Sequence, residues 1–158
     1  MSGKVSPRLA KYCQNRQTPG MTADEIIAHL NLAPHPEGGH YRQTWVADGH
    51  GRPCGTCIYF LLAEGERSHW HRVDATEIWH FYAGAPLILS MSATDAGPKT
   101  DHVLGADLGA GQMPQLIVPA HHWQSAVSTG AFTLVGCTVS PGFQFDGFEL
   151  APDGFDIH

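Results

Sequence analysis

Apolar and polar residues alternate along much of the chain after residue 40, the period expected of β-strands that bury one face. The alternation is clearest around Leu87, Leu89 and Met91 and again over residues 131–139. Glycine and proline turns separate the apolar segments and predict strands at 41–45, 55–63, 67–72, 76–82, 86–93, 101–107, 114–118, 123–128, 131–139 and 143–149. Many short strands of this kind predict an all-β sandwich or barrel.

The chain before these strands has a different character. Residues 1–20 mix Lys, Arg, Ser and Pro without periodicity, and we expect them to form a flexible leader. Thr22 stands three residues before Glu25, the spacing of a capping box, and an apolar stripe follows. This predicts a short helix that Pro34 ends, at the start of a single domain over 21–158.

Composition and charge narrow the function classes. Hydrophobic residues make up 42% of the 158 residues and charged residues 15%, as in a folded domain with a core of its own. The formal net charge of −6 argues against a nucleic-acid partner, because phosphate binding needs clustered basic residues. No apolar run approaches the ~20 residues that span a bilayer. We therefore expect a cytoplasmic protein without a membrane partner.

Two of the four cysteines, Cys54 and Cys57, have the spacing of a redox or zinc-binding pair. No second pair of this spacing completes a structural zinc site. Because the pair opens an apolar run, reduced cysteines in a strand are the simpler interpretation.

The clearest chemical signal is the pattern Gly65-x3-His69-x-His71-x5-Glu77-x6-Gly84. Histidines at i and i+2 of a strand point to the same face, and a carboxylate from the next strand can join them. Two histidines and a carboxylate suit a divalent transition metal, so His69, His71 and Glu77 are predicted metal ligands. Polar residues on a solvated face are the alternative.

The same residues resemble the cupin superfamily and, within it, the cupin-5 group, long catalogued as a domain of unknown function. The segments that carry the resemblance are Pro34-His-Pro-Glu-Gly-Gly39, Ser68-His-Trp-His-Arg72, Glu77-Ile-Trp-His-Phe-Tyr82, Gly84-Ala-Pro-Leu87, Val118-Pro119, Trp123-Gln124 and Leu134-Val-Gly-Cys-Thr-Val-Ser-Pro-Gly-Phe143. The resemblance implies a double-stranded β-helix (cupin jelly roll) of two antiparallel sheets, with a ligand pocket in the barrel mouth and usually a homodimeric assembly. It also implies a likeness to sugar epimerases and isomerases of this fold.

Two departures from the general cupin motifs weaken the metal prediction. Five residues separate His71 from Glu77, which is more than the general motif has. Aligned on Pro119, the chain has Gln124 where the second motif ends in a histidine, and glutamine is the weaker ligand for first-row metals.

Other candidate ligand contacts come from strand geometry and residue chemistry. Alternation sends Glu77 and Trp79 to one face, and the position of Glu77 in the motif implies that this face is the inner one, so Trp79 is a predicted pocket wall. Gln124 is a predicted polar pocket residue that orients a ligand. Arg42 offers a planar fork to an anionic ligand, although an exposed strand arginine is an equal alternative. Tyr59 could supply a phenol, but nothing in the spacing selects it over Tyr82.

Three functions stay open for a protein with these residues. The first is an isomerase or epimerase that acts on a sugar-like or carboxylated metabolite, with His71 and Glu77 as acid and base. The second is a metal-dependent oxygenase, lyase or isomerase that uses His69, His71 and Glu77. The third is a metabolite-binding protein without catalysis.

Overall fold

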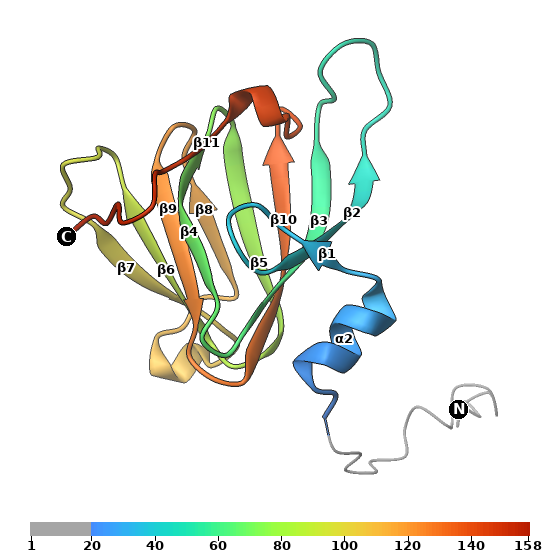
Figure 1. The fold of residues 1–158 in the computed structure, drawn as a ribbon, viewed down its shortest axis with the longest axis vertical. Coiled ribbons are helices and arrows are strands. Elements are labelled where there is room, and N and C mark those ends of the chain that lie inside the picture. The colour runs from blue at the N-terminus through green and yellow to red at the C-terminus, as the bar shows by residue number, and fades with distance from the viewer. Residues whose placement is uncertain (1–19) are drawn as a thin grey trace, which may run out of the picture.

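A computed structural model describes residues 20–158 and contains two stacked antiparallel sheets (Figure 1). The strands are β1 (Ala33–Pro34), β2 (His40–Val46), β3 (Thr56–Ala63), β4 (Arg67–Val73), β5 (Thr76–Gly84), β6 (Leu87–Ser92), β7 (Thr100–Leu104), β8 (Gln115–Val118), β9 (Trp123–Ser128), β10 (Phe132–Ser140) and β11 (Phe148–Leu150). A six-stranded sheet has the order β1-β2-β3-β10-β5-β8, and a five-stranded sheet the order β11-β4-β9-β6-β7. This arrangement confirms the predicted jelly roll.

The predicted helix is α2 (Ala23–Leu30), and both hydrogen bonds of its capping box are present. Thr22 Oγ1 accepts from the Glu25 amide, and the Glu25 carboxylate accepts from the Thr22 amide at 2.8 Å. The helix ends at Asn31, which adopts a left-handed conformation (φ 52°) and closes the last turn before Pro34 is reached. The predicted leader, residues 1–20, lies outside the described residues except for Gly20.

The predicted strand over 143–149 is wrong for most of its length. A 3-10 helix occupies Phe145–Gly147, and only the short β11 follows. Phe143, Phe145 and Phe148 pack on one another edge to face, with ring centroids 5.1–6.1 Å apart. On a regular strand, Phe148 would lie on the opposite face from Phe143 and Phe145. The mutual packing of the three rings therefore requires the chain to turn here.

The register of the six-stranded sheet determines which side chains share its inner face. Residues paired across neighbouring antiparallel strands point to the same side. One such row runs across β2, β3, β10 and β5 through Gln43, Ile58, Cys137 and Trp79. The next row contains Thr56, Val139 and Glu77. Both rows face the five-stranded sheet, so the space between the sheets receives side chains from four strands.

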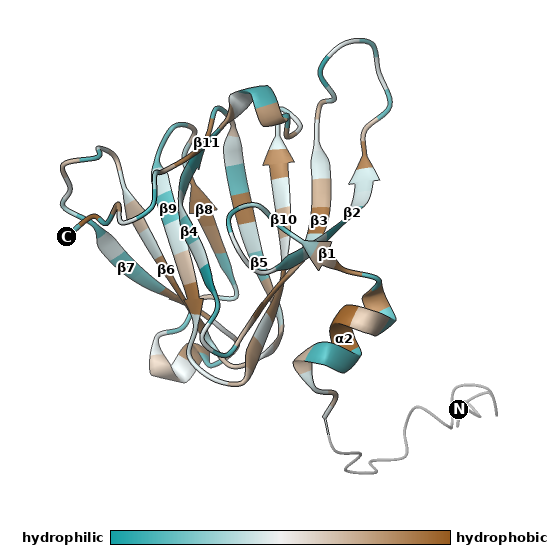
Figure 2. Cartoon of the chain, viewed as in Figure 1, coloured by the Kyte–Doolittle hydropathy of each residue, from teal (hydrophilic) through white to brown (hydrophobic). Residues whose placement is uncertain are grey.

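Apolar side chains fill most of the space between the sheets, and Figure 2 shows the alternation of hydrophobic and hydrophilic residues along strands such as β5. The main cluster contains Phe60, Leu62, Trp79, Leu89 and Val135, all of them buried. Outside the six-stranded sheet, α2 packs Ile26 against Leu61. No helix in residues 20–158 has the length and apolar character needed to cross a membrane.

The turn between β1 and β2 provides a test of the close packing around the interior. Gly38 has φ +107°, and a Cβ there would collide with the backbone carbonyl of Arg67. Gly51 has φ +77°, but no atom lies within 4 Å of the equivalent position. Gly38→Ala should lower the free energy of unfolding by about 3 kcal/mol or more, and Gly51→Ala by only ~1–2 kcal/mol. Urea unfolding of both variants checks this, and equal losses would contradict it.

Candidate functional site

A cavity of about 170 Å³ opens between the two sheets, beside the Phe143–Phe148 segment. Its walls come from the inner rows of the six-stranded sheet, from β4 and from the turn between β1 and β2. Most of the wall is apolar. The polar side chains that line it are His35, Glu37, Tyr41, Gln43, Thr56, His71, Glu77 and Cys137.

The β1–β2 turn carries Glu37 into the interior. The Glu37 carbonyl accepts a hydrogen bond from the His69 amide at 2.8 Å, which ties the turn to β4. The Ser68 hydroxyl donates to Glu37 Oε1, also at 2.8 Å. Glu37 is therefore held by two neighbours on β4, with its other carboxyl oxygen free to face the cavity histidines.

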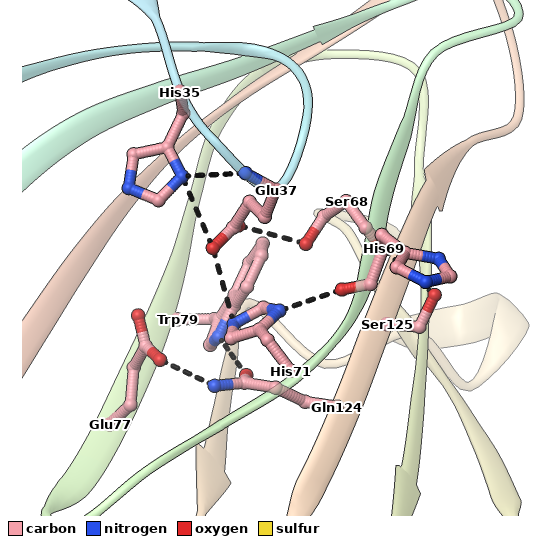
Figure 3. A network of polar contacts seen from close by, with 9 residues as sticks. All are labelled: His35, Glu37, Ser68, His69, His71, Glu77, Trp79, Gln124 and Ser125. Carbon is pink, nitrogen blue, oxygen red and sulfur yellow. Dashed lines mark hydrogen bonds and ion pairs between the residues drawn. The ribbon is translucent and has the colours of Figure 1, made fainter. Parts of the chain in front are cut away.

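His71 has a defined orientation and tautomer. Its Nδ1 lies 2.8 Å from the His69 carbonyl, and because a carbonyl can only accept, Nδ1 carries the proton. In the neutral ring, Nε2 is then an acceptor, and it lies 3.4 Å from Glu37 Oε2 (Figure 3). His71 thus presents a basic nitrogen to the interior.

His35 offers a second acceptor to the same carboxyl group. The Glu37 amide donates to His35 Nδ1 at 3.3 Å, so this nitrogen carries no proton. Glu37 Oε2 lies 3.3 Å from it as well. A proton on Glu37 Oε2 therefore has an imidazole acceptor on either side, His35 and His71.

The pKa shifts favour uncharged forms of these three groups. Burial raises the pKa of Glu37 to about 8, although the Ser68 hydrogen bond opposes this rise. Burial lowers the pKa of His71, and it lowers the pKa of His35 to about 4. Near neutral pH the contact of Glu37 with His71 is accordingly a hydrogen bond from a carboxylic acid to an imidazole, and not an ion pair.

Glu77 lies at the end of a directed chain of hydrogen bonds (Figure 3). The Trp79 indole, which can only donate, bonds to Gln124 Oε1 at 2.9 Å, and Gln124 Nε2 donates to Glu77 Oε2 at 2.6 Å. Burial raises the pKa of Glu77, while His71 and the Gln124 amide act in the opposite direction. An amide suits this position because it accepts from the indole and donates to the carboxyl group.

The structure separates the residues predicted from the sequence into three groups. His71, Glu77 and Trp79 line the cavity, and Gln124 lies behind them, 1% exposed. Arg42 and Tyr59 do not line it. They lie on the outer face of the six-stranded sheet, where the Arg42 guanidinium is 5.7 Å from the centre of the Tyr59 ring.

The predicted metal ligands do not converge. His69 Nε2 donates to the Pro152 carbonyl at 3.1 Å, so its ring is directed away from Glu77 (Figure 3). The pairing of β4 with β9 changes register between Ser68 and His71, which interrupts the regular alternation on which the prediction rested. Within residues 20–158, no three His, Cys, Asp or Glu side chains are placed to hold a metal ion. The donor set therefore does not fit a resident metal.

Sequence reasoning missed the cavity roles of His35, Glu37, Tyr41 and Cys137. The segment Pro34–Gly39 entered the sequence analysis only as one of the segments that resemble the cupin-5 group, without a role in the site. Its two glycines were the available signal, because consecutive glycines allow a close backbone approach and here bring the turn against β4.

Comparison with known proteins identifies the family. The family model described as Cupin_5, cupin superfamily (DUF985), matches residues 24–151. The chain belongs to the Cupin_5 family. No curated protein matches the sequence.

Solved structures agree with this assignment. A protein from Shewanella oneidensis has 43% sequence identity and a TM-score of 0.79, over 84% of this chain and 85% of that one. A hypothetical protein from Leishmania major has 29% identity and a TM-score of 0.79, over 85% and 90%. Oxalate decarboxylase from Bacillus subtilis shares only the fold, with 11% identity and a TM-score of 0.58 over 74% of this chain and 29% of that one.

The buried carboxyl groups predict a fall in stability on the alkaline side. Because the pKa of Glu37 is about 8 in the folded protein and 4.5 in its ordinary state, the folded form retains a proton that the unfolded chain releases. Glu77 acts in the same direction, whereas the lowered pKa values of His35 and His71 act oppositely below their ordinary value of 6.5. The free energy of unfolding should therefore fall by about 2 kcal/mol for Glu37 between pH 6.5 and 8.

Urea unfolding at several pH values measures this fall, and Glu37→Gln should make the profile flatter. Glu64→Gln, at an exposed position outside the cavity, is the matched control and should keep the wild-type profile. A Glu37→Gln profile as steep as that of the wild type would contradict the assignment.

Proposed function

We propose that this cupin binds a small polar metabolite in its cavity and transfers a proton on it, as an isomerase or epimerase does. The observation that carries the proposal is that two differently oriented acid-base groups, His71 and Glu77, line one cavity. Each is held by hydrogen bonds, His71 through its own strand and Glu77 through Gln124. Fixed orientation of this kind is what proton transfer at carbon requires.

The chemistry follows from the protonation states. His71 Nε2 takes a proton from the carbon next to a carbonyl group, and the electron pair of the broken C–H bond moves to the carbonyl oxygen as an enolate. Glu77, whose pKa is raised by burial, can donate a proton to that oxygen or to the carbon from the other side. For His71 Nε2 to act as the base, the proton on Glu37 Oε2 must turn from this nitrogen to its other acceptor, His35 Nδ1.

Of the two substrate classes considered from the sequence, a sugar-like carbonyl compound fits this cavity better than a carboxylate. No lysine or arginine among the described residues lines the cavity, so a ligand carboxylate would find no permanent positive charge there. The carboxyl, hydroxyl and imidazole groups present can instead bond to ligand hydroxyls.

Exchange of solvent deuterium into carbon-bound positions tests the proton transfer. We expect mass spectrometry to detect deuterium uptake by a member of a panel of aldoses and ketoses incubated with the protein in D₂O. His71→Gln should slow this exchange by ~10²–10⁴-fold. His69→Gln is the matched control, because His69 is directed to the Pro152 carbonyl, and it should retain most of the exchange.

A ligand that binds to the wild type and to His71→Gln alike, without exchange in either, would contradict catalysis and favour a metabolite-binding protein. Equal loss of exchange in both histidine variants would contradict the separate roles of the two side chains.

We also propose a homodimer that forms through the outer face of the six-stranded sheet. This is supported by the family resemblance and by large apolar side chains exposed there, Trp45, Tyr82 and Ile117. Light scattering should give twice the chain mass for the wild type, and Ile117→Lys should shift it toward the monomer. Leu108→Lys, at an exposed site on the 3-10 helix Leu108–Ala110, should leave the mass unchanged. A monomeric wild type would contradict the dimer.

We also propose a cytoplasmic location. It is supported by the free thiols of Cys54, Cys57 and Cys137, since thiols persist in a reducing compartment.

A further inference from the structure

The cavity contains acidic groups without a permanent cation to balance them. The titratable side chains that face it are His35 and Glu37 from the β1–β2 turn, Tyr41 from β2, His71 from β4, Glu77 from β5 and Cys137 from β10. Two of these are carboxyl groups, and neither lysine nor arginine of residues 20–158 belongs to the lining. Any permanent positive charge beside the carboxyl groups must therefore come from a ligand.

Glu77 has one oxygen prepared for such a ligand. The side chain is only 7% exposed, and its Oε2 is bonded to Gln124. The only other protein donor to this carboxyl group among the described residues is the Cys137 thiol, a weak one, and no nitrogen or hydroxyl donor bonds to Oε1. Figure 3 shows the two carboxyl oxygens of Glu77 in different directions, one toward Gln124 and one away from it. A buried carboxyl oxygen that borders a cavity and has at most a thiol as its donor is an acceptor available to a bound molecule.

The hydrogen-bond chain behind Glu77 also favours its charged form. Both the Trp79 indole and the Gln124 amide donate in the direction of the carboxyl group. Only the Gln124 amide reaches the carboxyl group, and the indole fixes the orientation of that amide. A donor to a carboxylate stabilises the anion, whereas burial in an apolar wall opposes it. A cation in the cavity would resolve this conflict, because it supplies the attraction that the protein itself does not provide.

The remaining walls suit a cation as well. Six aromatic side chains line the cavity: Tyr41, Phe60, Trp79, Phe143, Phe145 and Phe148. Aromatic faces carry negative potential and attract ammonium groups, most strongly in tryptophan. A ligand carboxylate, by contrast, would meet aromatic faces and carboxyl groups together.

We infer that the ligand of this cavity carries a protonated amine, and that its ammonium group binds Glu77 Oε1 between the aromatic walls. This inference rests on the proposed binding function of the cavity and narrows its substrate to an amine-bearing compound. Glu77 is ionised in the complex, so a Glu77 that is protonated in the free protein releases its proton to solvent on binding. With such a ligand Glu77 is a binding group and no longer the acid of the proposed reaction, and that role passes to the Glu37 carboxyl group beside His71.

Three probes built on one benzene ring test the inference by calorimetry: benzylamine and benzyl alcohol, which have nearly the same shape, and benzoate, which has a planar carboxylate. At neutral pH the polar group of these probes is cationic, neutral and anionic, respectively. We expect benzylamine to bind about tenfold or more tightly than benzyl alcohol, as a charge-assisted hydrogen bond and a cation–π contact together provide. Benzoate should bind most weakly. The heat of benzylamine binding should also vary with the ionisation enthalpy of the buffer, which reports the released proton.

Glu77→Gln keeps the shape of the side chain and removes its charge, so it should abolish both the preference for benzylamine and the proton release. Glu64→Gln should change neither. Because the proton release is measured on the wild type, the test does not depend on the folding of the variant. Benzoate binding as tight as that of benzylamine, no binding of benzylamine, or an unchanged preference in Glu77→Gln would overturn the inference. Deuterium exchange without amine preference would leave the proposed function intact and overturn only the ligand class.

Discussion

Two carboxyl groups are buried between apolar sheets where no lysine or arginine of residues 20–158 lines the cavity, and much of the local structure serves to hold them there. A buried carboxyl group without hydrogen bonds costs several kcal/mol, so each one needs partners. Glu37 has the Ser68 hydroxyl and two imidazoles, and Glu77 has the Gln124 amide. Burial then raises the pKa of both groups, that of Glu37 to about 8, so Glu37 retains its proton near neutral pH.

The two carboxyl groups reach the cavity by different routes. Glu77 belongs to a regular strand, where alternation alone directs it inward beside Val139 and Thr56. Glu37 belongs to a turn, and it reaches the interior because the turn lies against β4, where its carbonyl accepts from the His69 amide. That same contact places Glu37 beside His71. Strand β5 therefore positions Glu77, and the β1–β2 turn places Glu37 beside His71.

The two faces of the six-stranded sheet have separate roles. Its inner face supplies the cavity wall, while its outer face carries Arg42, Tyr59 and the exposed Tyr82. The relatives from Shewanella oneidensis and Leishmania major match this chain over most of its length. These proteins share the fold of this chain. A shared fold does not determine a reaction, which depends on the few side chains that reach the cavity.

The sequence by itself determined the fold class and the rough place of the site. Local rules and the motif were sufficient there: alternation predicted most strands and the shared face of Glu77 and Trp79, the motif position implied that this face is the inner one, and a capping box predicted the helix. Local rules were not sufficient for the β1–β2 turn and for β4, whose pairing with β9 is irregular. Only the tertiary structure brought Glu37 to His71, because their contact joins segments that no local periodicity relates. It also turned His69 to the Pro152 carbonyl, since a change of strand register overrides the alternation at that point. The motif that suggested a metal site is instead the edge of a cavity with two buried acids and a neutral imidazole.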